Sequence, residues 1–197
     1  MSENTPQNTN YLPYIFAGAG LILIAVAGVF FGTSQVQQAG DPGAGEQGGE
    51  TIFPPAQLDE PAPELTLESL DGEQVSLADF QGQVVLVNNW ATWCPPCKAE
   101  MPELNDYYLD HRDEGFQVLA VEAGDPVQQV QAFVEEEGID FTVLLDPENK
   151  SLERFENASL PNSFIIDRQG NLRLTWTGAI NRATLEKHVN PLLEEGS

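Results

Sequence analysis

Residues 84–100 read VVLVNNWATWCPPCKAE, and this stretch decides the fold. The run Val84–Ala91 is apolar apart from two asparagines, which is typical of a central strand buried on both faces of a sheet. Pro95 and Pro96 suit the first turn of a helix, and apolar side chains recur at helical spacing from Cys97 onwards. The stretch therefore predicts a buried strand that leads directly into a helix, with Cys94 at the start of the helix.

The flanking sequence predicts further strands and helices in alternation. Two short alternating runs, Glu64–Leu70 and Glu73–Leu77, are joined by Asp71-Gly72, a strong signal for an N-terminal β-hairpin. The elements predicted after the first helix are strand Phe116–Glu122, helix Val127–Glu137, strand Phe141–Leu145, helix Ser151–Glu156, strands Ser163–Asp167 and Leu172–Thr177, and helix Arg182–Leu193. This order indicates an α/β three-layer sandwich with a mixed sheet.

The first part of the chain has a different composition. No charged side chain occurs between Glu3 and Asp41, and residues 15–32 read IFAGAGLILIAVAGVFFG, enough to span about 27 Å as a helix. A cleaved signal peptide is the alternative, but the preceding residues lack Lys and Arg and no A-x-A site follows. We therefore expect a short tail at 1–14, one transmembrane helix at 15–32, a flexible linker rich in Gly, Gln and Pro at 33–57, and a globular domain at 58–197.

Composition excludes several classes of protein. The chain has 197 residues, with 31 acidic against 8 basic side chains and a formal charge of −23. Such a charge repels nucleic-acid phosphates and anionic lipid headgroups, so we expect no nucleic-acid partner. With two cysteines and two histidines, the chain cannot be a disulfide-dense scaffold, and we expect no resident metal.

The chemistry is predicted at Cys94 and Cys97. Two sulfurs at Cys-x-x-Cys spacing can close a disulfide, and the positive end of the helix dipole favours a thiolate at the first. A thiolate attacks disulfides, whereas a thiol does not. A static disulfide and half of a metal site are the alternatives, and a copper chaperone is the non-enzymatic function that the motif also allows. Pro95 and Pro96 offer no N–H to the Cys94 sulfur, so we expect a weakly stabilised thiolate, which is typical of a reductant.

The stretch FQGQVVLVNNWATWCPPCKAEMPEL, residues 80–104, resembles the membrane-anchored thioredoxin-like oxidoreductases of the TlpA and ResA type. The resemblance implies a thioredoxin-like fold from about Leu58 onwards. Leu160-Pro161 and the three residues after it resemble the cis-proline loop of that fold, which lies beside the cysteine pair and can pair with an incoming peptide like a strand. The residues that the resemblance implies as client-binding are Trp93, Pro95, Pro96, Leu160 and Pro161.

The resemblance also concerns three positions near the motif. Asn88 stands where ordinary thioredoxins have a buried Asp, and Glu100 stands where the ResA-like branch has the Glu that exchanges a proton with the second cysteine. Asn89 departs from the pattern, because the family usually has an aromatic residue there. Peroxidases of the related fold need Thr or Ser three residues before their attacking cysteine, and here that residue is Ala91.

The predicted function is that of a membrane-tethered thiol:disulfide oxidoreductase that uses no cofactor. Cys94 attacks, Cys97 resolves and Glu100 assists. We expect the domain to be extracytoplasmic on a single-pass anchor, because a reducing cytosol already maintains protein thiols. The resemblance implies clients with cysteine pairs, such as apocytochrome c, and a membrane thiol carrier as the reductant. A thiol oxidase or isomerase on the same fold is the alternative within this class.

Overall fold

The computed structural model describes residues 54–195, in which strands and helices alternate along the chain. The strands are β1 (Ala56–Pro61), β2 (Thr66–Ser69), β3 (Gln74–Ser76), β4 (Val84–Trp90), β5 (Phe116–Glu122), β6 (Thr142–Leu145), β7 (Asn162–Ile166) and β8 (Asn171–Thr177). The helices are α1 (Pro95–His111), α2 (Val127–Glu137), α3 (Lys150–Arg154), α4 (Arg182–His188) and α5 (Asn190–Glu194), with short 3₁₀ turns η1 (Leu77–Phe80) and η2 (Arg112–Glu114).

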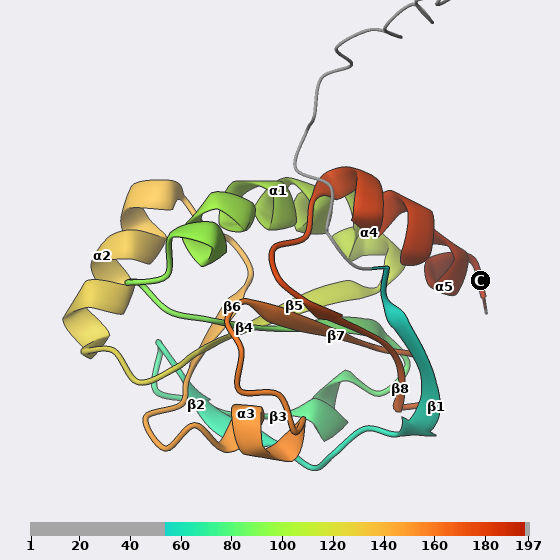
Figure 1. Cartoon of the computed structure of the whole chain (residues 1–197), viewed down its shortest axis with the longest axis horizontal. Coiled ribbons are helices and arrows are strands. Elements are labelled where there is room, and N and C mark those ends of the chain that lie inside the picture. Colours follow the sequence, from blue (N-terminus) through green and yellow to red (C-terminus); the bar gives the residue numbers. More distant parts are fainter. Residues whose placement is uncertain (1–53, 196–197) are drawn as a thin grey trace, which may run out of the picture. The chain divides into compact units, whose positions relative to one another are not determined.

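Within these residues one mixed sheet of eight strands forms the middle layer, in the order β1-β8-β7-β4-β5-β6-β2-β3. Helices α1, α2, α4 and α5 cover one face, and α3 and η1 lie on the other (Figure 1). Apolar side chains fill both spaces between the layers, with Leu86 and Met101 in one cluster and Val87 and Phe164 in the other. The predicted α/β three-layer sandwich is confirmed.

Strand β4 lies at the centre of the sheet and is buried along its whole length. Its apolar sequence predicts this burial on both faces. The strand runs parallel to β5 and antiparallel to β7. Because side chains alternate along a strand, neighbouring residues Asn88 and Asn89 point to opposite faces of the sheet. Asn88 faces α1, and Asn89 lies on the face that carries α3.

The predicted N-terminal hairpin is confirmed. Strands β2 and β3 pair antiparallel, with Thr66 opposite Ser76. The turn between them contains Gly72 at φ +81°, a conformation that L side chains rarely adopt. Strand β2 also pairs with β6, so the hairpin extends the main sheet.

One strand and the last helix differ from the prediction, and the short turns η1 and η2 were also not predicted. Strand β1 was not predicted, and it places Ala56 and Gln57, the last residues of the predicted linker, in the sheet as antiparallel partners of β8. Its side chains are nearly all exposed, so no alternation of apolar residues marks it. The predicted helix Arg182–Leu193 is two helices, because Pro191 lacks the N–H that a continuous helix needs; α4 ends at His188 and α5 begins at Asn190.

The predicted tail at 1–14, the transmembrane helix at 15–32 and most of the linker lie outside the described residues. Among the helices at 54–195, none combines the length and the apolar character that a membrane crossing requires.

Candidate active site

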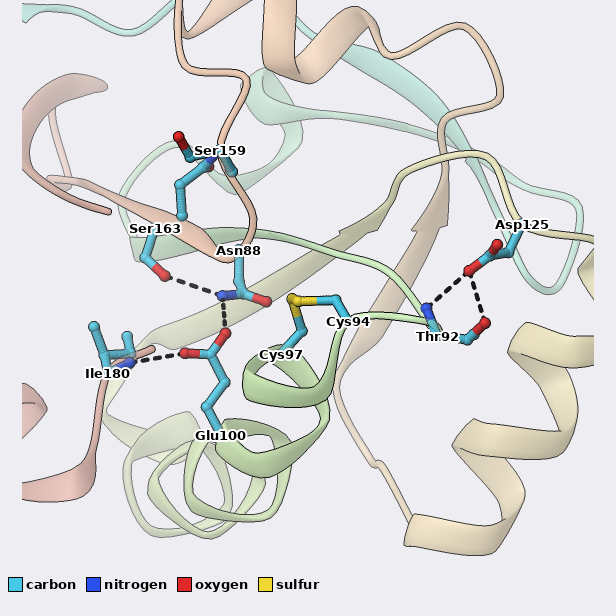
Figure 2. Close-up of a disulfide and its surroundings, with 10 residues drawn as sticks. Asn88, Thr92, Cys94, Cys97, Glu100, Asp125, Ser159, Ser163 and Ile180 are labelled. Carbon is cyan, nitrogen blue, oxygen red and sulfur yellow. Dashed lines mark hydrogen bonds between the residues drawn. A yellow bond between two sulfur atoms is a disulfide. The ribbon is translucent and has the colours of Figure 1, made fainter. Parts of the chain in front are cut away.

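Cys94 and Cys97 form a disulfide at the start of α1, with their Cα atoms 5.3 Å apart (Figure 2). Cys94 retains 4% of its surface, whereas Cys97 is completely buried. An attacking sulfur must reach the client, and a resolving sulfur has to reach only its neighbour. The exposure of the two residues therefore fits Cys94 as the nucleophile and Cys97 as the resolving thiol.

The end of β4 and the two prolines place this disulfide. Cys94 is the N-cap of α1, and Pro95 and Pro96 fill its first turn, as the sequence predicts. The Cys94 side chain accepts no capping hydrogen bond. Pro95 and Pro96 are exposed, and Trp93 is 66% exposed, so the residues on either side of Cys94 in the sequence offer apolar surface to a client.

Glu100 is buried, with 3% of its surface exposed, although its side chain is ionisable. Its Oε1 accepts a hydrogen bond of 2.9 Å from Asn88 Nδ2, and its Oε2 accepts one of 2.8 Å from the Ile180 amide (Figure 2). Asn88 Nδ2 also donates to Ser163 Oγ at 3.0 Å. Burial raises the pKa of Glu100 to about 7, and the hydrogen bonds from Ile180 and Asn88 oppose this rise.

A carboxyl group that titrates near pH 7 can both accept and donate a proton under physiological conditions. Glu100 follows Cys97 by three residues on α1, so the two side chains lie on adjacent parts of the helix surface. The predicted acid is thus buried on the same helix as the second cysteine, with a pKa of about 7.

The Leu160-Pro161 peptide bond is cis, as the resemblance to the cis-proline loop implies. Strand β7 begins directly after this bond, and its Ser163 pairs with Asn88 near the end of β4. Because β4 and β7 are antiparallel, the start of β7 lies beside the end of β4, from which the cysteine loop departs. Leu160 is half-buried and Pro161 is buried. The fold therefore brings the two predicted parts of the site to the same edge of the sheet.

The sequence did not reveal an acidic cluster that supports the loop before Cys94. Asp125 Oδ2 accepts hydrogen bonds from both the amide (2.8 Å) and the hydroxyl (2.7 Å) of Thr92 (Figure 2). The carboxylate of Glu122 in turn accepts hydrogen bonds from the amides of Gly124 and Asp125. Burial, together with the Asp125 charge, raises the pKa of Glu122 to about 7. An acidic residue at the end of the apolar strand β5 was the signal that could have indicated this cluster.

Asn89, the departure from the family pattern, is almost completely buried, and its Nδ2 donates a hydrogen bond of 2.7 Å to Asn162 Oδ1. Local packing is therefore completed by a polar pair instead of an aromatic ring. Within residues 54–195, no group of three or more His, Cys, Asp or Glu side chains is arranged to hold a metal ion.

The chain is similar to several known proteins. Residues 58–175 match the model of the AhpC/TSA family. The thiol-disulfide oxidoreductase ResA of Geobacillus kaustophilus is 34% identical over 131 residues, which cover 66% of this chain and 75% of that protein. ResA of Bacillus subtilis is 31% identical over 129 residues, which cover 66% of this chain and 72% of that protein.

Solved structures have the same fold. A crystal structure from Chlorobium tepidum, assigned to a thiol:disulfide interchange protein DsbE, superimposes with a TM-score of 0.65 at 30% identity, and the match covers 70% of this chain and 98% of that one. Together with the disulfide and its surroundings, these similarities identify the activity as well as the fold. The chain belongs to the AhpC/TSA family of thioredoxin-like proteins and is a thiol–disulfide oxidoreductase.

Proposed function

We propose that this enzyme reduces disulfides of extracytoplasmic client proteins while tethered to the membrane by residues 15–32. The observation that carries the reductive direction is the N-cap position of Cys94, whose side chain accepts no capping hydrogen bond, because a weakly stabilised thiolate is typical of a reductant. The exchange step itself is supported by Glu100, buried on α1 three residues after Cys97 with a pKa of about 7. The dithiol form reacts productively only when the resolving thiol loses its proton, and Glu100 is the acid–base group available for that step.

Each turn of the cycle transfers two electrons. The Cys94 thiolate attacks a client disulfide, forms a mixed disulfide and releases the first client thiolate, which takes a proton from solvent. Cys97 then gives its proton to the Glu100 carboxylate and attacks Cys94 Sγ. The mixed disulfide breaks, the second client thiolate leaves and takes up the proton from Glu100, and the Cys94–Cys97 disulfide remains. A dithiol donor, which we propose is a membrane thiol carrier, returns the two electrons.

The surroundings of Cys94 support binding of an extended client segment. Trp93, Pro95 and Pro96 offer exposed apolar surface next to the sulfur. On the other side, the hydrogen bonds among the described residues leave the backbone N–H and C=O of Leu160 unused. A client strand could pair with these groups, which require no particular client side chain. This mode of binding suits clients with cysteine pairs, such as apocytochrome c.

The AhpC/TSA family also includes peroxidases, but this site favours disulfide exchange. Ala91, three residues before Cys94, is buried and carries no hydroxyl group. The nearby hydroxyl of Thr92 donates its hydrogen bond to Asp125. Neither residue offers a free hydroxyl to a bound peroxide.

The function is tested by trapping clients in cells with the variant Cys97→Ser, which cannot resolve the mixed disulfide at Cys94. The double variant Cys94→Ser/Cys97→Ser is the matched control, because it has the same fold and no attacking sulfur. We expect extracytoplasmic proteins with cysteine pairs to be captured by the single variant alone.

Captured cytosolic proteins would contradict the proposed location. Equal recovery with both variants, together with stoichiometric copper binding by the wild type, would favour a copper chaperone instead. A wild-type enzyme that forms client disulfides instead of reducing them would indicate an oxidase or isomerase.

A further inference from the structure

Asn89 and Asn162 form a buried amide pair at the point where β4 and β7 lie side by side. They are opposite each other in the antiparallel register, and neither exposes more than 1% of its surface. The pair lies on the face of the sheet that carries α3, opposite the face on which Asn88 contacts Glu100. It is therefore separate from the proton-exchanging group of the active site.

The pair is tied to the loop that precedes the cis-proline. Asn162 Nδ2 donates to the carbonyl oxygen of Asn157 at 3.1 Å and to that of Ser159 at 2.6 Å. Its Oδ1 accepts the hydrogen bond of 2.7 Å from Asn89. The Asn162 amide thus uses both of its N–H groups on the loop and its oxygen on β4.

These contacts fix the orientation of both amides. The two loop carbonyls can only accept hydrogen bonds, so Asn162 has to direct its NH₂ group towards them and its oxygen towards Asn89. Asn89 then has to present its own NH₂ group. Reversing either amide would bring two acceptors or two donors together. Asn89 therefore completes the hydrogen bonding of Asn162 in the single orientation that binds the loop.

The same loop carries Leu160, whose backbone groups are unused within the described part of the chain. The ends of the loop are held by two other contacts: Asn157 Nδ2 donates to Thr177 Oγ1 at 2.9 Å, and the Gly178 amide donates to the Pro161 carbonyl at 2.8 Å. Between these points, only the buried Asn162 amide reaches the Ser159 carbonyl, directly before Leu160. The position of the Leu160 backbone thus depends on the asparagine pair.

We propose that Asn89 and Asn162 are positioning residues for client binding: they hold residues 157–160 so that the Leu160 backbone can pair with an extended client segment beside Cys94. This inference rests on the proposed client-reducing function. The pair does not contact the reacting sulfurs, so it affects recognition of a polypeptide and leaves the intrinsic reactivity of Cys94 unchanged.

The test compares the wild type with Asn89→Leu on two oxidants of the reduced enzyme. One is a peptide with an internal disulfide and several residues on each side of both cysteines, and the other is the small disulfide 5,5′-dithiobis(2-nitrobenzoate). We expect the second-order rate constant with the peptide to fall about tenfold, which corresponds to the loss of one backbone hydrogen bond with the client. The rate constant with the small disulfide should stay within about twofold, because no peptide backbone is recognised.

Asn105→Ala is the matched control, since Asn105 is also buried and also fixes a loop through Gly138 and Asp140, but that loop joins α2 to β6. We expect this control to lose stability without losing preference for the peptide. If Asn89→Leu does not fold, Asn89→Val, whose side chain suits a buried strand, is measured in its place.

A parallel fall of both rate constants in the Asn89 variant, or no fall in either, would overturn the role of the pair. A wild type that reacts with the small disulfide and with no peptide disulfide would instead overturn the proposed client-reducing function, and the inference with it. The two failures are therefore distinguishable.

Discussion

Asn88 donates a hydrogen bond of 2.9 Å to the carboxylate of Glu100, and both side chains are buried between β4 and α1. The resemblance implies an ionisable Asp at position 88 in ordinary thioredoxins, and here the amide instead supports an acid on the neighbouring helix. The amide carries no charge, so its hydrogen bond stabilises the ionised form of Glu100 and adds no second titratable group to the site. We therefore expect proton exchange near the cysteines to depend on the Glu100 carboxyl group, whose pKa is set by burial and by these hydrogen bonds.

The raised pKa of Glu100 makes the folded state less stable at high pH. A carboxyl group whose pKa rises from 4.5 in the unfolded chain to about 7 in the fold costs no stability below pH 4.5. The cost grows as the pH rises towards 7 and reaches on the order of 3 kcal/mol above it. We therefore expect oxidised Glu100→Gln to match the wild type at pH 4 and to be more stable by up to that amount at pH 8. Urea unfolding at both pH values measures the difference, and equal stabilities at pH 8 would contradict the raised pKa.

Asn88→Leu should raise the pKa of Glu100 further. The variant removes a hydrogen bond that lowers this pKa and leaves burial in place. Because a hydrogen bond to a charged group contributes about 1.5–3 kcal/mol, we expect an upward shift of about one unit or more. Infrared or NMR titration of the carboxyl group gives the value directly. Ser163→Ala is the control, since it removes the other partner of Asn88 and keeps the bond to Glu100; an equal shift in this control would argue against a direct effect.

Thr92→Val should loosen the loop before Cys94. The variant removes a hydroxyl that donates to the Asp125 carboxylate at 2.7 Å, while the Thr92 amide keeps its own bond to the same oxygen. We expect the free energy of unfolding of the oxidised protein to fall by about 1–2 kcal/mol. Thr175→Val is the control, because the Thr175 hydroxyl has no hydrogen-bond partner within residues 54–195 and its loss should cost less. Similar losses of unfolding free energy in both variants would show that the hydrogen bond to Asp125 adds no stability of its own.

Pro96→Ala should make the Cys94 thiol more acidic. It restores the N–H of the second helical residue, which is a usual donor to an N-cap side chain, and Cys94 is the N-cap without such a bond. A more stabilised thiolate favours the reduced protein, so the reduction potential should rise together with the fall in the Cys94 pKa. Pro95→Ala is the control, because the first helical N–H is less suited to that bond. Titration of the thiol and equilibration with glutathione give both quantities, and an unchanged pKa in Pro96→Ala would refute the explanation from missing donors.

The features that the sequence predicted are those with a local signal. The apolar run Val84–Ala91, the Asp71-Gly72 turn and the prolines after Cys94 each constrain their own few residues, and the structure has the corresponding strand, hairpin and helix. The cis bond before Pro161 followed from the resemblance to a family, not from local physics.

The missed features depend on pairing between distant segments. Strand β1 is an exposed edge strand, and only its hydrogen bonds with β8 identify it as part of the sheet. The bonds from Thr92 to Asp125 span 33 residues, and the bond from Asn89 to Asn162 spans 73. Neither pairing has a periodicity in the sequence, so the register of the sheet had to be known before these contacts could be seen.

The assignment of Cys97 as the resolving thiol and Glu100 as its proton acceptor is tested most directly by the rate of the second chemical step. A mixed disulfide between Cys94 and a chromophoric thiol is formed at pH 4, and release of the thiol is followed after a jump to pH values between 5 and 9. In the wild type we expect the rate to rise with an apparent pKa of about 7 and then to level off, as expected for a general base that is fully ionised. In Glu100→Gln we expect a slower release whose rate keeps rising about tenfold per pH unit, because hydroxide has to take the proton from Cys97. Superimposable pH profiles for the two proteins would contradict the role of Glu100.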